Sequence, residues 1–338
     1  MKVYILTEGG KNIGFGHITR CLSIFQAFEK RGATPVLLIN GDNTIQTILK
    51  KKKYKLLDWL KETDQTREIL RNSDMVLIDS YLADRKFYND VSEIVPIPVY
   101  IDDNRRLPYP RGIVVNGTTY AKKLGFQKNS KNTYFLGKQF ALFRKEFWSI
   151  PTKHIKKQIS SVLIFLGAND SRNLTPKILK LFTTGYPEWK KNVVVTDGFN
   201  NLEELTLTKD RKTFIIKNPD AKKIKELMMS SDIAITSGGQ TIYELCRVGI
   251  PAVVIMVAEN QKRSITDLHK LGAISFAGRW YDKNIITSIQ KHVEAFHSYN
   301  IRVKQSSRMR KVFDGASTLR LVDELINYCK RYQYEKKP

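Results

Sequence analysis

The stretch Ser230–Pro251 reads SSDIAITSGGQTIYELCRVGIP and decides the fold class. It begins with a short apolar run at Ile233–Thr236, turns at Ser237, Gly238 and Gly239, and continues with the apolar spacing of an amphipathic helix. A short, nearly all-apolar strand that leads into a helix is typical of a parallel sheet covered by helices on both faces. The stretch therefore predicts an α/β protein.

Apolar runs of the same kind recur on both sides of this stretch. The expected strands are Val3–Thr7, Pro35–Asn40, Met75–Asp79, Val99–Asp102 and Ile113–Asn116 in the first half, and Ser161–Leu166, Asn192–Thr196, Thr213–Ile216, Ile233–Thr236 and Pro251–Met256 in the second. A less regular segment, 118–157, separates the two series and is expected to connect them.

A chain of 338 residues suits two domains of about 150 residues each. We predict two Rossmann-like, doubly wound parallel-sheet domains with a cleft between them. The expected boundaries are 1–145 for the first domain, 146–160 for a linker and 161–316 for the second domain, with a final helix at 317–338 that packs back toward the first.

Three helices are marked by their side chains. The first carries a stripe of apolar residues at helical spacing, Ile18, Cys21, Leu22, Phe25 and Phe28. Another is expected to begin with Asn218 as its N-cap and Pro219 in its first turn. The last, from about residue 317 to 332, carries Leu319, Val322, Ile326 and Cys329 on one face.

The chain is strongly basic, with 57 Lys and Arg against 33 Asp and Glu and a formal net charge of +24. Such a charge fits a solvated basic surface, but also nucleic acid or a weak association with an anionic membrane surface. The basic residues are spread along the chain, with short runs at 50–53 and from Lys330, and no nucleic-acid-binding motif accompanies them. We expect no nucleic-acid partner. A positive field also attracts an anionic nucleotide.

The three cysteines, Cys21, Cys246 and Cys329, are odd in number and far apart, which argues against disulfides or a metal site. The N-terminal sequence MKVYILTEGG has an apolar run too short for a signal peptide. These features favour a reducing compartment, so we expect a cytoplasmic protein.

A glycine-rich loop, EGGKNIGFGHITR at 8–20, follows the first expected strand. Glycines let a ligand approach the backbone, and the amides at the start of the next helix favour negative charge. The loop lacks the third glycine of a dinucleotide-binding fingerprint, and the second strand ends in Asn40 rather than in an acidic residue. We therefore expect a substrate phosphate or developing charge here rather than NAD or FAD.

His17 opens the helix after this loop. The positive end of the helix favours a neutral imidazole, which can act as a base. A helix-capping or surface histidine is the alternative interpretation. The glycine-rich setting favours the functional one.

In the second half, the turn Ser237–Thr241 places small residues and amides at a helix N-terminus, which suits a diphosphate. Glu244 lies one turn further, where a carboxylate can accept hydrogen bonds from a ribose diol. A tight turn followed by a surface glutamate is the alternative.

With these residues the chain resembles the GT-B group of sugar-nucleotide enzymes, which includes the glycosyltransferase of peptidoglycan lipid II synthesis. Within that group it is similar to the UDP-sugar hydrolases of pseudaminic acid biosynthesis and to their spore-coat polysaccharide relatives. The resemblance covers nearly the whole chain and rests on IGFGHITR at 13–20, IDSY at 78–81, IDD at 101–103, VVNGTTYA at 114–121, GKQFALFRKEF at 137–147, the SGGQTIYE turn and AENQ at 258–261. The loop LGANDSRN at 166–173 departs from the Gly-Gly turn that is usual in the family.

The resemblance implies that UDP and a free sugar are released by water attack at the anomeric carbon, without a metal or a cofactor. It gives His17, Tyr81 and Asn260 as the catalytic and sugar-pocket residues. The substrate-binding residues that we expect are Gly14, Gly16, Arg20, Asp103, Ser237, Gly238, Gly239, Gln240, Thr241, Glu244 and Gln261.

Two other functions fit the same residues. A glycosyltransferase of this fold would use the histidine to deprotonate a sugar or lipid hydroxyl, with its basic surface facing an anionic membrane. A non-catalytic binder of sugar nucleotides or nucleic acid would bind without turnover. Asp102 and Asp103 could form a metal pair, but no His or Cys lies near them, so they are expected to cap a loop or hold the sugar pocket. The sequence leaves the sugar and the oligomeric state open.

Overall fold

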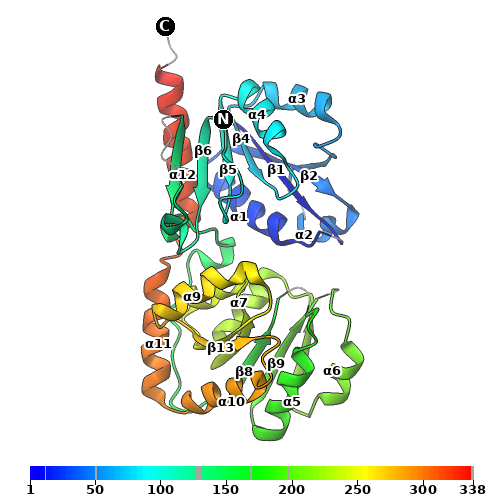
Figure 1. The fold of residues 1–338 in the computed structure, drawn as a ribbon, viewed down its shortest axis with the longest axis vertical. Coiled ribbons are helices and arrows are strands. Elements are labelled where there is room, and N and C mark those ends of the chain that lie inside the picture. Colours follow the sequence, from blue (N-terminus) through cyan, green and yellow to red (C-terminus); the bar gives the residue numbers. More distant parts are fainter. Residues whose placement is uncertain (12, 50–51, 127–130, 168–169, 197, 336–338) are drawn as a thin grey trace. The chain divides into compact units, whose positions relative to one another are not determined.

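A computed structural model describes all residues of the chain except 12, 50–51, 127–130, 168–169, 197 and 336–338 (Figure 1). The undescribed positions include Lys50 and Lys51 of the first basic run, the end of the basic tail, and Ala168 and Asn169 of the loop that departs from the family pattern. The chain divides into two compact units, 1–148 with 315–338, and 149–314. This boundary falls within the segment 146–160, which was expected to be a linker.

The first unit is a seven-stranded parallel sheet with the strand order β3-β2-β1-β4-β5-β6-β7. Its strands are β1 (Lys2–Gly9), β2 (Thr34–Gly41), β3 (Tyr54–Leu56), β4 (Met75–Asp79), β5 (Ile97–Ile101), β6 (Gly112–Asn116) and β7 (Asn132–Leu136). Its α-helices are α1 (Gly16–Lys30), α2 (Gln46–Leu49), α3 (Thr63–Arg71), α4 (Arg85–Ile94) and α12 (Ser317–Glu335), and its 3₁₀ helices are η1 (Asn43–Ile45), η2 (Ala121–Leu124), η3 (Lys138–Phe140) and η4 (Lys145–Phe147).

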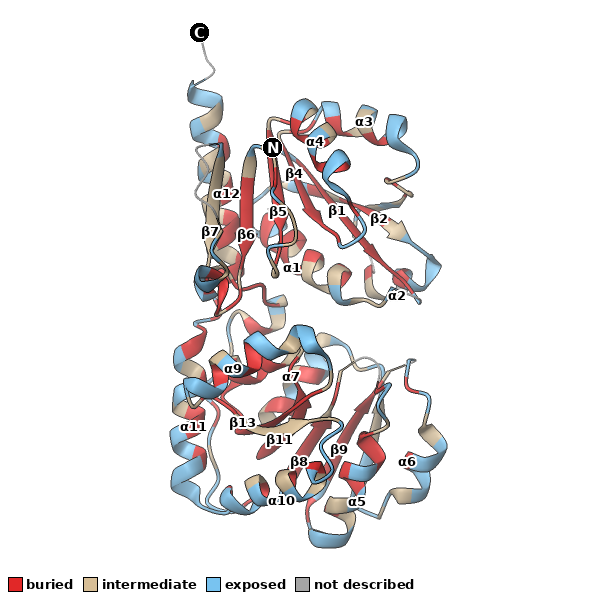
Figure 2. Ribbon diagram, in the orientation of Figure 1, coloured by how far each residue is buried: buried red, intermediate tan, exposed pale blue. Residues whose placement is uncertain are grey.

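Successive residues of a strand point to opposite faces of the sheet. In this sheet both faces are buried, because each is covered by helices. Val3 and Ile5 of β1 pack into a cluster with α1 and α12, whereas Tyr4 and Leu6 pack into a second cluster with α3 and α4. Figure 2 shows the resulting buried strands between partly exposed helices. The doubly wound arrangement is confirmed.

The second unit is a six-stranded parallel sheet with the order β10-β9-β8-β11-β12-β13. Its strands are β8 (Ser161–Phe165), β9 (Lys190–Val195), β10 (Thr213–Lys217), β11 (Ile233–Ser237), β12 (Ala252–Met256) and β13 (Ser275–Arg279). Its helices are α5 (Thr175–Gly185), α6 (Leu202–Thr208), α7 (Ala221–Ser230), α8 (Thr241–Val248), η5 (Glu259–Gln261), α9 (Lys262–Lys270), α10 (Ile285–Ala295) and α11 (Tyr299–Val312).

Three strands were not predicted from the sequence: β3, β7 and β13. All three lie at sheet edges, and their side chains are only partly buried or exposed, so they lack the long apolar runs of the inner strands. Because β7 pairs with β6 over five residues, the segment 118–157 is not simply an irregular connection.

The predicted start of α7 was wrong. Asp220, not Asn218, is the N-cap, and its side chain accepts a hydrogen bond from the Lys223 amide at 2.8 Å. Asn218 has a φ of 46°, so it lies in a left-handed turn ahead of the helix.

The last helix of the chain, α12, belongs to the first unit. Val322 and Cys329, predicted on its apolar face, are buried in the cluster that contains α1, and Leu319 and Ile326 pack against that cluster. The Phe143 amide donates to Thr318 Oγ1 at 2.7 Å and so ties the start of α12 to the segment after β7. All three cysteines are buried and free. Of the helices in the described residues, none is long and apolar enough to cross a membrane.

We expect Leu325→Ala in α12 to lower the free energy of unfolding by about 2–5 kcal/mol, because Leu325 is fully buried in the cluster with α1. Urea denaturation measures the loss. Leu207→Ala is the matched control, since Leu207 is 82% exposed and should change stability little. Equal effects of the two substitutions would contradict the packing of α12.

Candidate functional site

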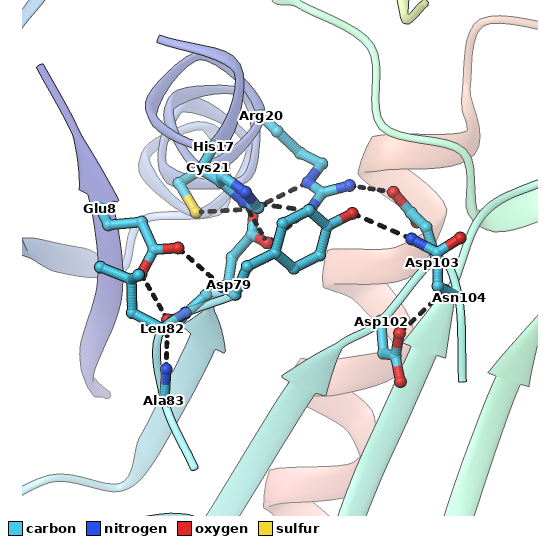
Figure 3. Close-up of polar contacts among 12 residues, drawn as sticks. Glu8, His17, Arg20, Cys21, Asp79, Leu82, Ala83, Asp102, Asp103 and Asn104 are labelled. Atoms are coloured by element: carbon cyan, nitrogen blue, oxygen red, sulfur yellow. Dashed lines mark hydrogen bonds and ion pairs between the residues drawn. The ribbon is translucent and has the colours of Figure 1, made fainter. Parts of the chain in front are cut away.

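The carboxyl ends of β1, β4 and β5 lie side by side in the first unit, since β4 pairs with both neighbours in parallel. Polar side chains from the loops after these strands meet there with the first turns of α1 (Figure 3). In doubly wound sheets this edge is where ligands bind. It is the candidate site of the first unit.

His17 lies in the first turn of α1 and points to the end of β4. Its Nδ1 is 2.9 Å from Asp79 Oδ1, and its ring meets that of Tyr81 edge-on at a centroid distance of 4.6 Å. An ionised carboxylate can only accept, so in the neutral imidazole Nδ1 carries the proton and Nε2 keeps its lone pair. The imidazole is thus oriented as a base.

Asp79 is the residue that orients His17, and it was not selected from the sequence. Its side chain is 1% exposed at the last position of β4. Burial alone would raise the pKa of Asp79, but the Arg20 guanidinium and the hydrogen bond to His17 outweigh it and hold the pKa well below its usual range. Asp79 therefore stays ionised beside His17.

Arg20 joins three elements at this edge. Its Nε donates to Asp79 Oδ2 at 2.7 Å, and its two terminal nitrogens pair with Asp79 Oδ1 and with Asp103 Oδ2. Arg20 lies three residues after His17, so both side chains leave the same face of α1. Arg20 and Asp103, both predicted to bind substrate, therefore also form the ion-pair network behind His17.

Tyr81 lies at the open side of the site. It is 44% exposed, and its hydroxyl accepts a hydrogen bond from Asn104 Nδ2 at 3.1 Å. Partial burial and the nearby Asp103 carboxylate raise the pKa of Tyr81, so the phenol stays neutral and can donate a hydrogen bond. His17, Arg20, Tyr81 and Asp103 are thus brought together.

The glycine loop before α1 closes by two backbone hydrogen bonds between Gly10 and Gly14, at 3.1 and 2.8 Å. Gly14 has a φ of 87°, which favours glycine. Gly16 does not have a positive φ, and a Cβ there would meet nothing within 4 Å among the described residues. The two predicted glycines therefore border open space beside His17.

Asp102 caps the loop after β5, one of the two roles expected for it. Its two carboxylate oxygens accept from the amides of Asn104 at 2.8 Å and Arg106 at 2.6 Å. Asp103 points to Arg20 instead. In the described part of the chain, no group of three or more His, Cys, Asp or Glu side chains could hold a metal ion.

In the second unit, the turn after β11 is fixed by side chains that were predicted to bind substrate. Ser237 Oγ donates to the Leu166 carbonyl at 2.8 Å. Gln261 Oε1 accepts from the amides of Gly238 at 3.2 Å and Val257 at 3.0 Å. A Cβ on Gly238 would come within 2.5 Å of Ile265, so this glycine permits close packing of α9. These contacts make the turn rigid.

The other predicted residues of this unit differ in exposure. Gly239 and Thr241 are partly buried, while Gln240 and Asn260 are exposed. Glu244 is 3% exposed, so the alternative of a surface glutamate does not hold. The amides of Ile242 and Tyr243 donate to the carbonyls of Gly239 and Gln240, both at 3.1 Å, and so close the first turn of α8. The turn ahead of them and the exposed side chains form the candidate site of this unit.

No protein-family model matches the chain. Among curated proteins, it is 28% identical over 292 residues to an uncharacterized protein of Methanocaldococcus jannaschii (80% of this chain, 58% of the relative). It is 25% identical over 276 residues to the pseudaminic acid cytidylyltransferase and UDP-2,4-diacetamido-2,4,6-trideoxy-beta-L-altropyranose hydrolase of Helicobacter pylori (80% and 47%). It is 22% identical over 336 residues to the spore coat polysaccharide biosynthesis protein SpsG of Bacillus subtilis (95% and 96%). The chain is thus similar in sequence to proteins named for UDP-sugar hydrolysis and for spore coat polysaccharide biosynthesis. It spans about half the length of the first two relatives.

Solved structures with the same fold include MurG of Acinetobacter baumannii, with a TM-score of 0.66 at 14% identity over 97% of this chain and 100% of that one. They also include UGT89C1 of Arabidopsis thaliana complexed with UDP, with a TM-score of 0.69 at 12% identity over 96% and 99%. The GT-B fold that the resemblance implied is thereby confirmed.

We expect Asp79→Asn to lower the free energy of unfolding by about 3 kcal/mol at neutral pH, because it removes one partner of a buried ion pair.

The pH dependence of stability should change as well. Folding lowers the pKa of Asp79, so its carboxylate stabilises the native state above the unfolded pKa of about 3.9. This contribution is lost as the pH falls toward the folded pKa. The variant has no carboxylate to protonate and should lose less stability than the unmodified chain between about pH 6 and pH 3. Urea denaturation across this range measures the slopes, and equal slopes would contradict the ion pair.

Proposed function

We propose that the protein is a UDP-sugar hydrolase that releases UDP and a free sugar in the biosynthesis of a nonulosonic acid or a surface or spore-coat polysaccharide. The observation that carries the proposal is the hydrogen bond from His17 to the ionised Asp79, which leaves Nε2 of the imidazole as a base. The relatives support the substrate class, since those of Helicobacter pylori and Campylobacter jejuni are named as UDP-2,4-diacetamido-2,4,6-trideoxy-beta-L-altropyranose hydrolases, the former also as a cytidylyltransferase.

In this proposal the second unit binds UDP. The amides of the turn Ser237–Thr241 would hold the diphosphate, and Glu244 would accept hydrogen bonds from the ribose. The contacts of Ser237 and Gln261 fix the turn before the nucleotide arrives, so that the amides need not rearrange as charge grows on the diphosphate.

The reacting sugar would contact the first unit. Nε2 of His17 takes a proton from water while the water oxygen bonds to the anomeric carbon. The bond from that carbon to the diphosphate oxygen breaks, and its electron pair leaves with UDP. Tyr81, and Asn260 of the second unit, would hold the sugar, with the neutral phenol of Tyr81 donating to a sugar oxygen. Gly14 and Gly16 have no side chains, so they leave room for the sugar ring beside His17.

The conjugate acid that forms on His17 is stabilised by Asp79, which is already ionised. Arg20 offsets the cost of burying that carboxylate and does not itself need to touch the substrate. General base catalysis by a group positioned in this way contributes about a hundred- to ten-thousand-fold in rate.

The second candidate is a glycosyltransferase, and it is favoured by solved structures of the same fold that are named as glycosyltransferases. The same imidazole would then deprotonate an acceptor hydroxyl instead of water.

We expect His17→Asn to retain UDP affinity and to lose about a hundred- to ten-thousand-fold in turnover, because it removes the base and leaves the nucleotide contacts in place. Calorimetric titration with UDP and chromatography of released UDP measure the two quantities. His154→Asn is the matched control, since His154 is exposed and should leave both unchanged. Normal turnover by the His17 variant would end the assignment.

Incubation with a panel of UDP-amino-sugars, with and without sugar or lipid acceptors, should distinguish the two activities. A hydrolase releases UDP at the same rate in both cases, and the free sugar accumulates. UDP release that requires an acceptor would replace the hydrolase with the transferase.

A further inference from the structure

Tyr81 is an exposed side chain that is nevertheless held from several directions. Its ring contacts His17, its hydroxyl contacts Asn104, and both its backbone groups are bound by charged side chains from other elements. Loop residues usually satisfy such groups with turns or water. Two charged side chains that bind the backbone of one loop residue therefore indicate that the position of this residue is specifically held.

The N–H of Tyr81 is bound by Glu8, at the carboxyl end of β1. Glu8 is 1% exposed, and its Oε1 accepts from the Tyr81 amide at 2.7 Å. Its Oε2 accepts from the Ser80 hydroxyl, whose oxygen in turn accepts from the amides of Leu82 at 2.9 Å and Ala83 at 3.0 Å (Figure 3). One buried carboxylate thus fixes the whole loop after β4.

The C=O of Tyr81 is bound by Arg106, in the loop after β5. One terminal nitrogen of Arg106 donates to this carbonyl at 2.5 Å, and the other donates to the Ala83 carbonyl at 3.2 Å. The guanidinium carbon is also 5.3 Å from the centroid of the Tyr81 ring. Arg106 is itself held, because its amide donates to Asp102.

We propose that Glu8 and Arg106 are positioning residues that hold the Tyr81 ring beside the His17 imidazole. The inference rests on the proposed function for its effect on turnover, but not for its effect on the loop. Hydrogen bonds to ionised groups are about twice as strong as neutral ones, and these two act on the donor and the acceptor of one residue. A displacement of about 1 Å in a catalytic side chain can reduce turnover about a hundredfold.

The first experiment measures kcat, UDP affinity and amide hydrogen exchange in Glu8→Ala and Arg106→Ala. We expect kcat to fall about ten- to a hundredfold with UDP affinity unchanged. The Tyr81 amide should exchange at least about tenfold faster in Glu8→Ala, because it loses its acceptor. Glu8→Gln keeps a carbonyl oxygen for this amide and should restore most of both properties.

Asp84→Ala is the matched control. Asp84 also accepts a hydrogen bond from a backbone amide, that of Phe87 at 2.8 Å, but as the exposed N-cap of α4 it does not touch Tyr81. This variant should lose stability and keep kcat. If it lost kcat as Glu8→Ala does, general destabilisation would explain both, and the positioning role would be overturned.

A second experiment repeats the substitutions in a Tyr81→Ala background. Residues that act through the Tyr81 ring should reduce kcat no further there, whereas independent effects would multiply. Multiplied losses, or an unchanged exchange rate of the Tyr81 amide in Glu8→Ala, would overturn the proposal. If Glu8→Ala does not fold, kcat and the exchange rate of the Tyr81 amide are measured in Arg106→Ala and Glu8→Gln, and these values test the proposal. If the unmodified chain hydrolyses no UDP-sugar, the proposed function fails, and the exchange rates alone decide whether Glu8 holds the loop.

Discussion

The buried ion pair between Arg20 and Asp79 is the interaction on which the first unit's site depends. A carboxylate at the end of a fully buried strand is costly unless a cation and hydrogen bonds compensate it. Arg20 supplies that cation from the helix that also carries His17, three residues earlier. The fold can therefore keep an ionised acceptor under the imidazole, and the imidazole can keep one tautomer.

The two candidate sites are held together by different kinds of interaction. In the first unit, charged side chains lie behind His17 and leave its ring partly exposed. In the second unit, Ser237 and Gln261 tie loops together by neutral hydrogen bonds to backbone groups. The first arrangement suits proton transfer, and the second suits a preformed cradle for an anion.

Much of the fold could be predicted from the sequence, because the inner strands are apolar runs and the helices between them carry apolar residues at helical spacing. The edge strands β3, β7 and β13 did not, since half-exposed strands resemble loops in composition. His17 stood out because it follows a glycine loop. Asp79 did not stand out, although an acidic residue that ends an otherwise apolar strand is a usable signal. Glu8 carries the same signal at the end of β1. What the sequence could not supply was the pairing of these carboxylates with Arg20 and with the Tyr81 amide, which arises only when β1, β4 and β5 align.

The return of α12 to the first unit has a consequence for biosynthesis. Part of the apolar surface of α1 is covered by α12, a helix that the ribosome makes only after every residue of the second unit. Domains generally fold as units during translation, but the first unit stays incomplete until the second unit has been made. The nascent chain therefore carries an uncovered hydrophobic surface on α1 while the second unit is being made, which is the kind of surface that chaperones bind.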